Sequence, residues 1–266
     1  MRFENLKFGV VAGDGVIFVD DSRFIFGGTG LSLQDPASCT VLNSAFDGID
    51  ESSTAGIAVW RAAEAEISNC TFDNARIYFD SSPRTVVSDC TVTSGELVSY
   101  YRSGGEVLRS VADCIGGSYG IAISECDTIR IEDSTIIGGL RNVTAGGAGT
   151  VLIAERNVFR DPTYRTNFDI GYEVTIIAHD NDIYAGAGMP YVVEVCCYPV
   201  GTSATIDFGN NYWGEHSNTA ALDSLIYDGD DDPNIHVIVN YEPIRTESVP
   251  VEKKSLGGLK ALFLGR

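Results

Sequence analysis

The 266-residue chain carries 37 acidic and 18 basic side chains, which gives a formal net charge of −19 at pH 7. This excess of negative charge argues against nucleic acid and anionic membranes as partners, because both require a basic face. It also disfavours a polyanionic substrate, unless bound cations or a local arginine cluster reverse the field. The 44% hydrophobic content suffices for one elongated domain with a continuous core.

We expect residues 1–15 to form an irregular first coil. After them, a six-residue pattern recurs along the chain. The pattern consists of an apolar residue, a variable residue, Asn or Asp, a small or polar residue, one further residue and a second apolar residue. Clear copies are residues 67–72, 87–92 and 131–136. The spacing of the copies indicates a solenoid. The third position falls at residues 21, 43, 69, 89, 113, 133, 156, 180 and 210.

Each copy indicates strands, because its apolar residues alternate with a period of two. The chain has only four lysines and no leucine skeleton, which argues against helical and leucine-rich repeats. A second short strand begins 12 residues before the third position in five copies. We therefore predict an all-β, single-stranded parallel β-helix of about nine coils, stacked ~4.8 Å apart into a rod roughly 40 Å long. These second strands begin at Leu31, Ile57, Ile77, Ile121 and Phe168.

Stacking of the coils places like residues above one another. The Asn and Asp residues of the pattern are expected to form a hydrogen-bonded ladder inside a turn, where Asn tolerates left-handed backbone. Cys70, Cys90 and Cys114 are interpreted as a column of small buried side chains. The vicinal Cys196 and Cys197 are not expected to bond to each other. The odd total of seven cysteines leaves at least one thiol free unless chains pair.

The segment that closes the solenoid, residues 204–245, carries three short motifs. They are residues 209–214 (GNNYWG), 225–233 (LIYDGDDDP) and 239–243 (VNYEP), and residues 246–266 follow as a C-terminal tail. This segment resembles the closing segment of bacterial right-handed parallel β-helix proteins. These proteins belong to the pectin-lyase-like superfamily, with its carbohydrate-binding and sugar-hydrolase-type repeats. The resemblance covers about residues 16–245 and implies a right-handed coil.

The same resemblance implies an exported or cell-surface protein, although residues 1–15 lack the order of a signal peptide. No apolar run reaches about 18 residues, so no membrane span is expected. The fold hosts lyases, hydrolases, epimerases and adhesins, so it does not specify an activity.

In proteins of this fold, ligands usually lie across one exposed strand face. If Ile57 and Ile77 point inward, alternation turns their neighbours outward. In the coil of residues 96–102, either Tyr100 or Tyr101 points outward. Aromatic rings offer faces to sugars and arginines offer fixed hydrogen bonds, whereas the alternative is that the rings only pack across neighbouring strands. The predicted binding residues are Trp60, Arg76, Tyr78, Tyr100 and Arg102.

The sequence offers only weak candidates for catalysis, namely Arg165, Asp169 and Asp80. Asp80 and Asp169 would lie four coil steps apart, or about 19 Å. That is too far for a glycosidase pair. A lyase or epimerase would instead need a base such as Arg or Tyr, with calcium or Arg to neutralise a uronate.

We therefore expect an exported or cell-surface β-helix that binds polysaccharide on an exposed strand face. One alternative is a polysaccharide lyase, epimerase or glycoside hydrolase that acts on the same face. Another is a non-catalytic structural module of a larger surface or filament protein, with end-to-end or self association.

Two further groups of polar residues have weaker interpretations. Asp228, Asp230 and Asp232 would supply oxygen ligands to calcium, or would only shape a structural loop. His179 stacks in line with Glu155 and Glu132, and we interpret it as a member of a surface ion pair.

Overall fold

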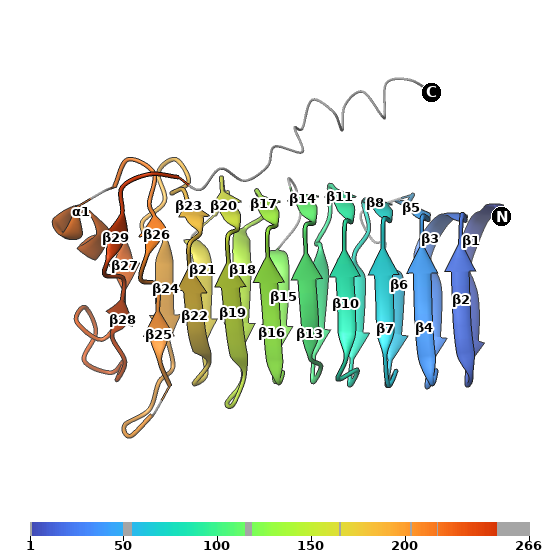
Figure 1. Cartoon of the computed structure of the whole chain (residues 1–266), viewed down its shortest axis with the longest axis horizontal. Coiled ribbons are helices and arrows are strands. Elements are labelled where there is room, and N and C mark those ends of the chain that lie inside the picture. Colours follow the sequence, from blue (N-terminus) through green and yellow to red (C-terminus); the bar gives the residue numbers. More distant parts are fainter. Residues whose placement is uncertain are drawn as a thin grey trace.

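A computed structural model of the chain describes residues 2–49, 55–114, 119–164, 166–202, 204–216 and 218–248. In these ranges the strands wind into a rod, along which the sequence advances steadily from one end to the other (Figure 1). Successive coils pair through parallel strands, as when Val41 faces Ile67 and Ile67 faces Val87. The predicted parallel β-helix is therefore confirmed.

Each regular coil contributes one strand to each of three sheets. Among the described residues, sheet I contains ten strands, close to the nine or so coils expected. They are β2 (Val16–Asp20), β4 (Ser38–Leu42), β7 (Ala65–Ser68), β10 (Thr85–Ser88), β13 (Gly105–Leu108), β16 (Thr128–Glu132), β19 (Val151–Glu155), β22 (Thr175–His179), β25 (Ile206–Asp207) and β28 (Val239–Asn240).

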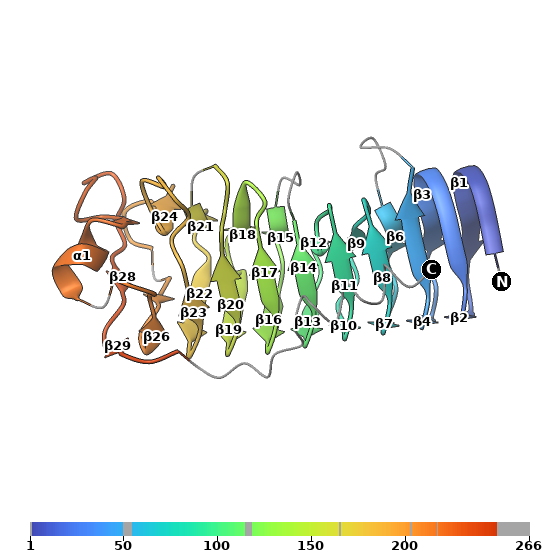
Figure 2. The same cartoon turned by 90° about the horizontal axis from the view of Figure 1, so that it is seen from above.

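Sheet II follows sheet I in each coil, and Figure 2 shows several of its strands in a row. Its members are β5 (Ala45–Gly48), β8 (Thr71–Asp73), β11 (Thr91–Thr93), β14 (Val111–Asp113), β17 (Thr135–Ile137), β20 (Val158–Arg160), β23 (Asp182–Ile183), β26 (Asn211–Tyr212) and β29 (Ile244–Arg245).

Sheet III completes the coil. The long strands β1 (Arg2–Gly13) and β3 (Arg23–Gln34) pair along both sheets and join sheets II and III at the first coils. The other members of sheet III are β6 (Ala55–Trp60), β9 (Ile77–Asp80), β12 (Val98–Tyr101), β15 (Tyr119–Ser124), β18 (Arg141–Gly146), β21 (Thr166–Gly171), β24 (Val193–Cys196) and β27 (Ile226–Tyr227).

The core fills the inside of the coil with columns of apolar side chains. Phe24, Phe46 and Phe72 stack on successive coils of sheet II, with ring centroids 4.7 and 5.1 Å apart. On sheet III the predicted inward residues are buried, among them Ile57 and Ile77. Burial of each such side chain contributes about 1.5–3 kcal/mol, so the core is the main stabilising feature of the rod.

The turn between sheets I and II has the predicted left-handed residues, but the hydrogen-bonded ladder is formed by the side chains one position farther along the chain. In each turn a residue with left-handed backbone precedes a small inward side chain, and in the fifth turn this residue is Arg109, not the expected Asp113. The buried column therefore contains Ser110 where Cys114 was expected, and it ends in three asparagines. The left-handed residues are Asp21, Asn43, Asn69, Asp89, Arg109, Asp133, Arg156, Asp180 and Asn210.

The asparagine ladder satisfies buried backbone groups between coils. The Asn157 backbone N–H donates to Oδ1 of Asn181 at 2.9 Å, and the Asn181 N–H donates to Oδ1 of Asn211 at 2.8 Å. The side-chain amides continue the chain, since Nδ2 of Asn157 donates to Oδ1 of Asn181 at 3.0 Å. A polar column inside the turn is stable because its members satisfy one another.

The two ends of the rod differ from the sequence-based expectation in detail. The first coil is mostly regular strand, and the irregularity expected for residues 1–15 is confined to register shifts between Phe3 and Phe8. The closing segment contains α1 (Thr219–Asp223), whose first turn is capped by the side chain of Asn218. Residues 249–266 of the expected tail lie outside the described residues, and end-to-end association stays a prediction. The described part of the chain contains no helix with the length and apolarity of a membrane span.

Candidate functional site

Sheet III presents an aromatic patch on its outer face, which we define as Trp60, Tyr78, Tyr101 and the adjoining Arg102. Trp60 ends β6 and Tyr78 lies in β9, and their ring centroids are 6.0 Å apart with planes inclined by 57°. In register, Trp60 faces Asp80 and Asp80 faces Tyr101 on the next coil. The patch therefore surrounds one carboxylate with three rings.

Tyr101, not Tyr100, is the outward tyrosine of β12. Tyr100 is only 2% exposed and stacks on Phe79, with centroids 5.3 Å apart. Burial raises the pKa of Tyr100 well above its ordinary value. The prediction that Tyr100 lies on the exposed face is therefore wrong. Tyr101 takes its place, and the guanidinium carbon of Arg102 lies 4.6 Å above its ring centroid.

The two arginines of the predicted site have different surroundings. Arg102 is exposed, and its Nε lies 2.9 Å from Oε2 of Glu125, which fixes the guanidinium over Tyr101. Arg76 lies partly exposed, and its Nη1 forms an ion pair at 2.9 Å with Glu96, a carboxylate that is only 8% exposed. Burial raises the pKa of Glu96, although the ion pair with Arg76 and the Ser99 hydroxyl oppose the shift. Arg76 thus stabilises the charge of the buried Glu96 carboxylate on the neighbouring coil.

Asp80 is oriented for hydrogen bonding inside the patch. Its Oδ1 accepts a hydrogen bond from the Ser81 hydroxyl at 2.7 Å. Burial raises the pKa of Tyr78, and the negative charge of Asp80 adds to this effect. Tyr78 therefore keeps its proton and can donate a hydrogen bond, while the Asp80 carboxylate can only accept. This pairing suits the alternating donors and acceptors of a sugar.

Asp169 belongs to a second polar group farther along sheet III. It faces Glu194 on the next coil, so two carboxylates follow each other along the same outer row. Nε of Arg141 lies 2.9 Å from Oδ2 of Asp169, and the Thr144 hydroxyl lies 3.5 Å from the same oxygen. Glu194 is 7% exposed. Asp80 remains four coil steps from Asp169, about 19 Å, as expected.

Next to Asp169, β21 also contains a buried polar residue. Asn167 is buried, and its Nδ2 donates to Oδ1 of Asn142 at 2.7 Å. Asn167 thus forms a second amide ladder with Asn142 and does not lie on the outer row of sheet III. Arg165 lies outside the described residues.

Small side chains separate the aromatic patch from Asp169 and Glu194. The row of Tyr78 continues through Ser99, Ala122 and Thr144, and the row of Tyr101 continues through Ser124 and Gly146. None of these residues carries a long side chain. An extended ligand could therefore lie along the rod axis from the patch to the carboxylates, in contact with the strands.

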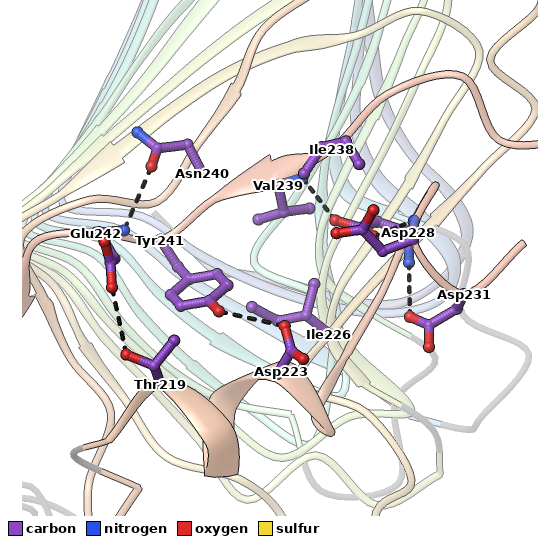
Figure 3. Close-up of a pocket in the computed structure, with 11 residues that line it drawn as sticks. Thr219, Asp223, Ile226, Asp228, Asp231, Ile238, Val239, Asn240, Tyr241 and Glu242 are labelled. Carbon is purple, nitrogen blue, oxygen red and sulfur yellow. Dashed lines mark hydrogen bonds between the residues drawn. The ribbon is translucent and has the colours of Figure 1, made fainter.

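A cavity of about 490 Å³ opens at the closing end of the rod (Figure 3). Asp228 lies on its wall, and its two carboxylate oxygens accept the backbone N–H groups of Asp230 and Val239 at 2.9 and 2.6 Å. Burial raises the pKa of Asp228. Oδ1 of Asp232 accepts both the backbone and side-chain N–H groups of Asn234.

These bonds give the acidic loop a structural role. Among the described residues, no three His, Cys, Asp or Glu side chains converge as a metal site requires. The geometry therefore gives no support to a calcium site formed by Asp228, Asp230 and Asp232.

Sheet I carries a second depression, of about 540 Å³, that the sequence did not suggest. Glu64, Glu66, Glu106 and Arg84 line it, and Arg84 forms an exposed ion pair with Glu64 at 3.1 Å. Farther along the same sheet, Nε2 of His179 lies 3.1 Å from Oδ2 of Asp207.

Comparison with known families identifies the class of the protein. Residues 10–211 match the family model described as the right handed beta helix region. The chain belongs to this family, and the pectin-lyase-like resemblance is consistent with it. Searches of curated proteins and of solved structures found no match. Membership in this family supports either a carbohydrate-active protein or a structural repeat protein.

Proposed function

We propose that the protein is an exported or cell-surface β-helix that binds a polysaccharide along sheet III. The observation that carries this proposal is the pairing of Trp60 and Tyr78 on consecutive coils, with the Tyr101–Arg102 stack one coil farther on. Partly exposed aromatic rings in a row offer apolar faces to successive sugar rings, while their polar edges reach hydroxyl groups.

The charge of the face favours a neutral polymer. Asp80, Asp169 and Glu194 all lie on outer rows of sheet III, and the chain as a whole carries a net charge of −19. A uronate polymer would meet like charges along this path, which disfavours association. Hydroxyl groups of a neutral glycan can donate to the same carboxylates.

A glycan array followed by calorimetric titration tests the proposal. We expect binding to neutral glycans, with affinity about tenfold lower in Trp60→Ala and in Tyr78→Ala, a loss of about 1.4 kcal/mol for each ring. Phe18→Ala is the matched control, because Phe18 is an exposed aromatic residue on sheet I. Its affinity should equal that of the unaltered protein. Equal affinity in all three variants would remove the aromatic patch from the proposal.

A second candidate function is hydrolysis of the bound glycan. It is favoured by Asp169 and Glu194, which face each other across adjacent strands with backbones about 4.8 Å apart. Retaining glycosidases hold their two carboxyl groups about 5–5.5 Å apart. Arg141, with its Nε 2.9 Å from Oδ2 of Asp169, would hold that carboxylate in place as the nucleophile, which leaves Glu194 as the acid.

Release of reducing ends from each array ligand tests this second function. Asp169→Asn and Glu194→Gln should each abolish release while binding persists. Release that continues in both variants would show that Asp169 and Glu194 do not carry the reaction. No release from any bound glycan would leave the protein a binding module only.

A further inference from the structure

Cys196 and Cys197 form the one exposed pair of neighbouring thiols in the described part of the chain. Cys196 ends β24 and is partly exposed, and Cys197 follows it and is exposed. Their sulfur atoms lie 3.0 Å apart, against about 2.05 Å in a disulfide. All seven cysteines are free thiols, and the other five are buried: Cys39, Cys70, Cys90, Cys114 and Cys126.

The local backbone brings the two sulfur atoms together. Gly171 faces Cys196 on the preceding coil, and a Cβ at Gly171 would lie 3.1 Å from the Cys196 sulfur. The absent side chain thus leaves room for that sulfur on the outer row. Cys197 adopts left-handed backbone with φ of 63°, which is uncommon for a residue other than glycine. This turn directs the second sulfur back toward the first.

We propose that Cys196 and Cys197 form a reversible redox site, which small-molecule disulfides of the glutathione type oxidise to a vicinal disulfide. The Cys197 thiolate attacks one sulfur of the oxidant and releases one thiol. The Cys196 sulfur then attacks the mixed disulfide, loses its proton and releases the second thiol. Two electrons and two protons pass from the protein to the oxidant.

The order of these steps follows from the surroundings of the two thiols. Burial is the main cause that raises the pKa of Cys196 to about 12, the neighbouring Cys197 adds to it, and Asp169 and Glu194 contribute less. Because the thiolate is the nucleophile, the exposed Cys197 reacts first and Cys196 resolves the mixed disulfide.

Ring strain makes the product easy to reduce. Consecutive Cα atoms lie about 3.8 Å apart, whereas disulfides usually join Cα atoms about 4.4–6.8 Å apart. Strained and exposed disulfides are the labile ones, so the bond should open again when a reductant is present. The site is therefore suited to reversible modification and not to structural cross-linking.

Mass spectrometry of the reduced protein after equilibration with excess oxidised glutathione tests the proposal. We expect the whole protein to lose two hydrogen atoms, with the bond mapped to Cys196 and Cys197 and reversed by a dithiol reductant. Cys196→Ser should instead retain glutathione on Cys197, because the resolving thiol is gone. Cys197→Ser should react with oxidised glutathione far more slowly than the unaltered protein or Cys196→Ser. Circular dichroism of both variants checks that the β-helix is intact.

Three outcomes would overturn the proposal. One is a stable glutathione adduct on Cys197 of the unaltered protein, which would show that Cys196 cannot resolve it. Another is a disulfide that maps to buried cysteines such as Cys70 and Cys90. The third is a disulfide between two chains through Cys197.

Discussion

Trp60 and Tyr78 lie one coil apart on sheet III with their ring centroids 6.0 Å apart, although 18 residues separate them in sequence. Parallel stacking of β6 on β9 brings the two rings together. Asp80 faces Trp60 and leads to Tyr101 on the following coil. The coil repeat thus forms the proposed binding face. Substitutions that disturb the contacts between coils should therefore lower the free energy of unfolding.

The asparagine ladder should be essential for stability. Oδ1 of Asn181 accepts the backbone N–H of Asn157, and its Nδ2 donates to the carbonyl of Ala154 at 2.8 Å. Asn181→Ala would leave these buried groups unsatisfied, so we expect the free energy of unfolding to fall by about 2–4 kcal/mol in urea titrations. Asn69→Gly is the control, because Asn69 is exposed with left-handed backbone that glycine adopts freely. A ladder variant as stable as this control would contradict the assigned role.

Arg245 should attach the closing segment to the coils. Its Nη2 lies 2.6 Å from Oδ1 of Asp182, a carboxylate that is 5% exposed, and β29 and β23 are separated by the single strand β26. Arg245→Met removes a charge partner from a buried carboxylate, so we expect a loss of about 2 kcal/mol or more in thermal or urea unfolding.

Asp182→Asn combined with Arg245→Met should lower the free energy of unfolding by less than the sum of the two single changes, because the double variant removes both charges. Arg84→Met should leave stability nearly unchanged, since the ion pair of Arg84 with Glu64 is exposed. Additive effects of the Asp182 and Arg245 changes would rule out the proposed coupling.

Glu96 should make stability depend on pH. Its folded pKa lies above the ordinary value because of burial, so the folded state favours the protonated carboxyl group more than the unfolded state does. This contribution is fully present below the ordinary pKa and is lost as pH rises through the raised pKa. Glu96→Gln cannot titrate, so its stability relative to the unaltered protein should increase between pH 4 and pH 7.

Urea unfolding of both proteins at the two pH values measures this difference. If the relative stability of Glu96→Gln fell as pH rose, the ion pair with Arg76 would outweigh burial and the assigned direction would be wrong.

The overall fold could be predicted because apolar alternation and the Asn or Asp positions repeat with every coil. The position of the fifth turn could not, because Asp113 fits the pattern better than Arg109. An arginine with left-handed backbone has no signature in composition, and here its guanidinium forms an ion pair with Asp89 at 2.7 Å. Contacts between coils, and not local preference, select this residue.

The candidate site was predictable only where the strand register was unambiguous. Trp60 and Tyr78 follow from the buried Ile57 and Ile77, but two adjacent tyrosines leave either Tyr100 or Tyr101 outside. The pairing of Asp169 with Glu194 was missed, because the longest interval between copies obscured the register of β24. The alternation of Val193, Glu194 and Val195 was the signal that could have revealed it.

Quenching of tryptophan fluorescence tests the proposed binding face most directly. The chain has two tryptophans, of which Trp213 is buried in the core and Trp60 lies partly exposed in the aromatic patch. Titration with acrylamide should quench Trp60 in the free protein, and a saturating glycan identified on the array should reduce that quenching. Trp60→Phe should show no such protection. Full glycan binding with unchanged quenching of Trp60 would contradict the proposal that the polysaccharide lies on sheet III.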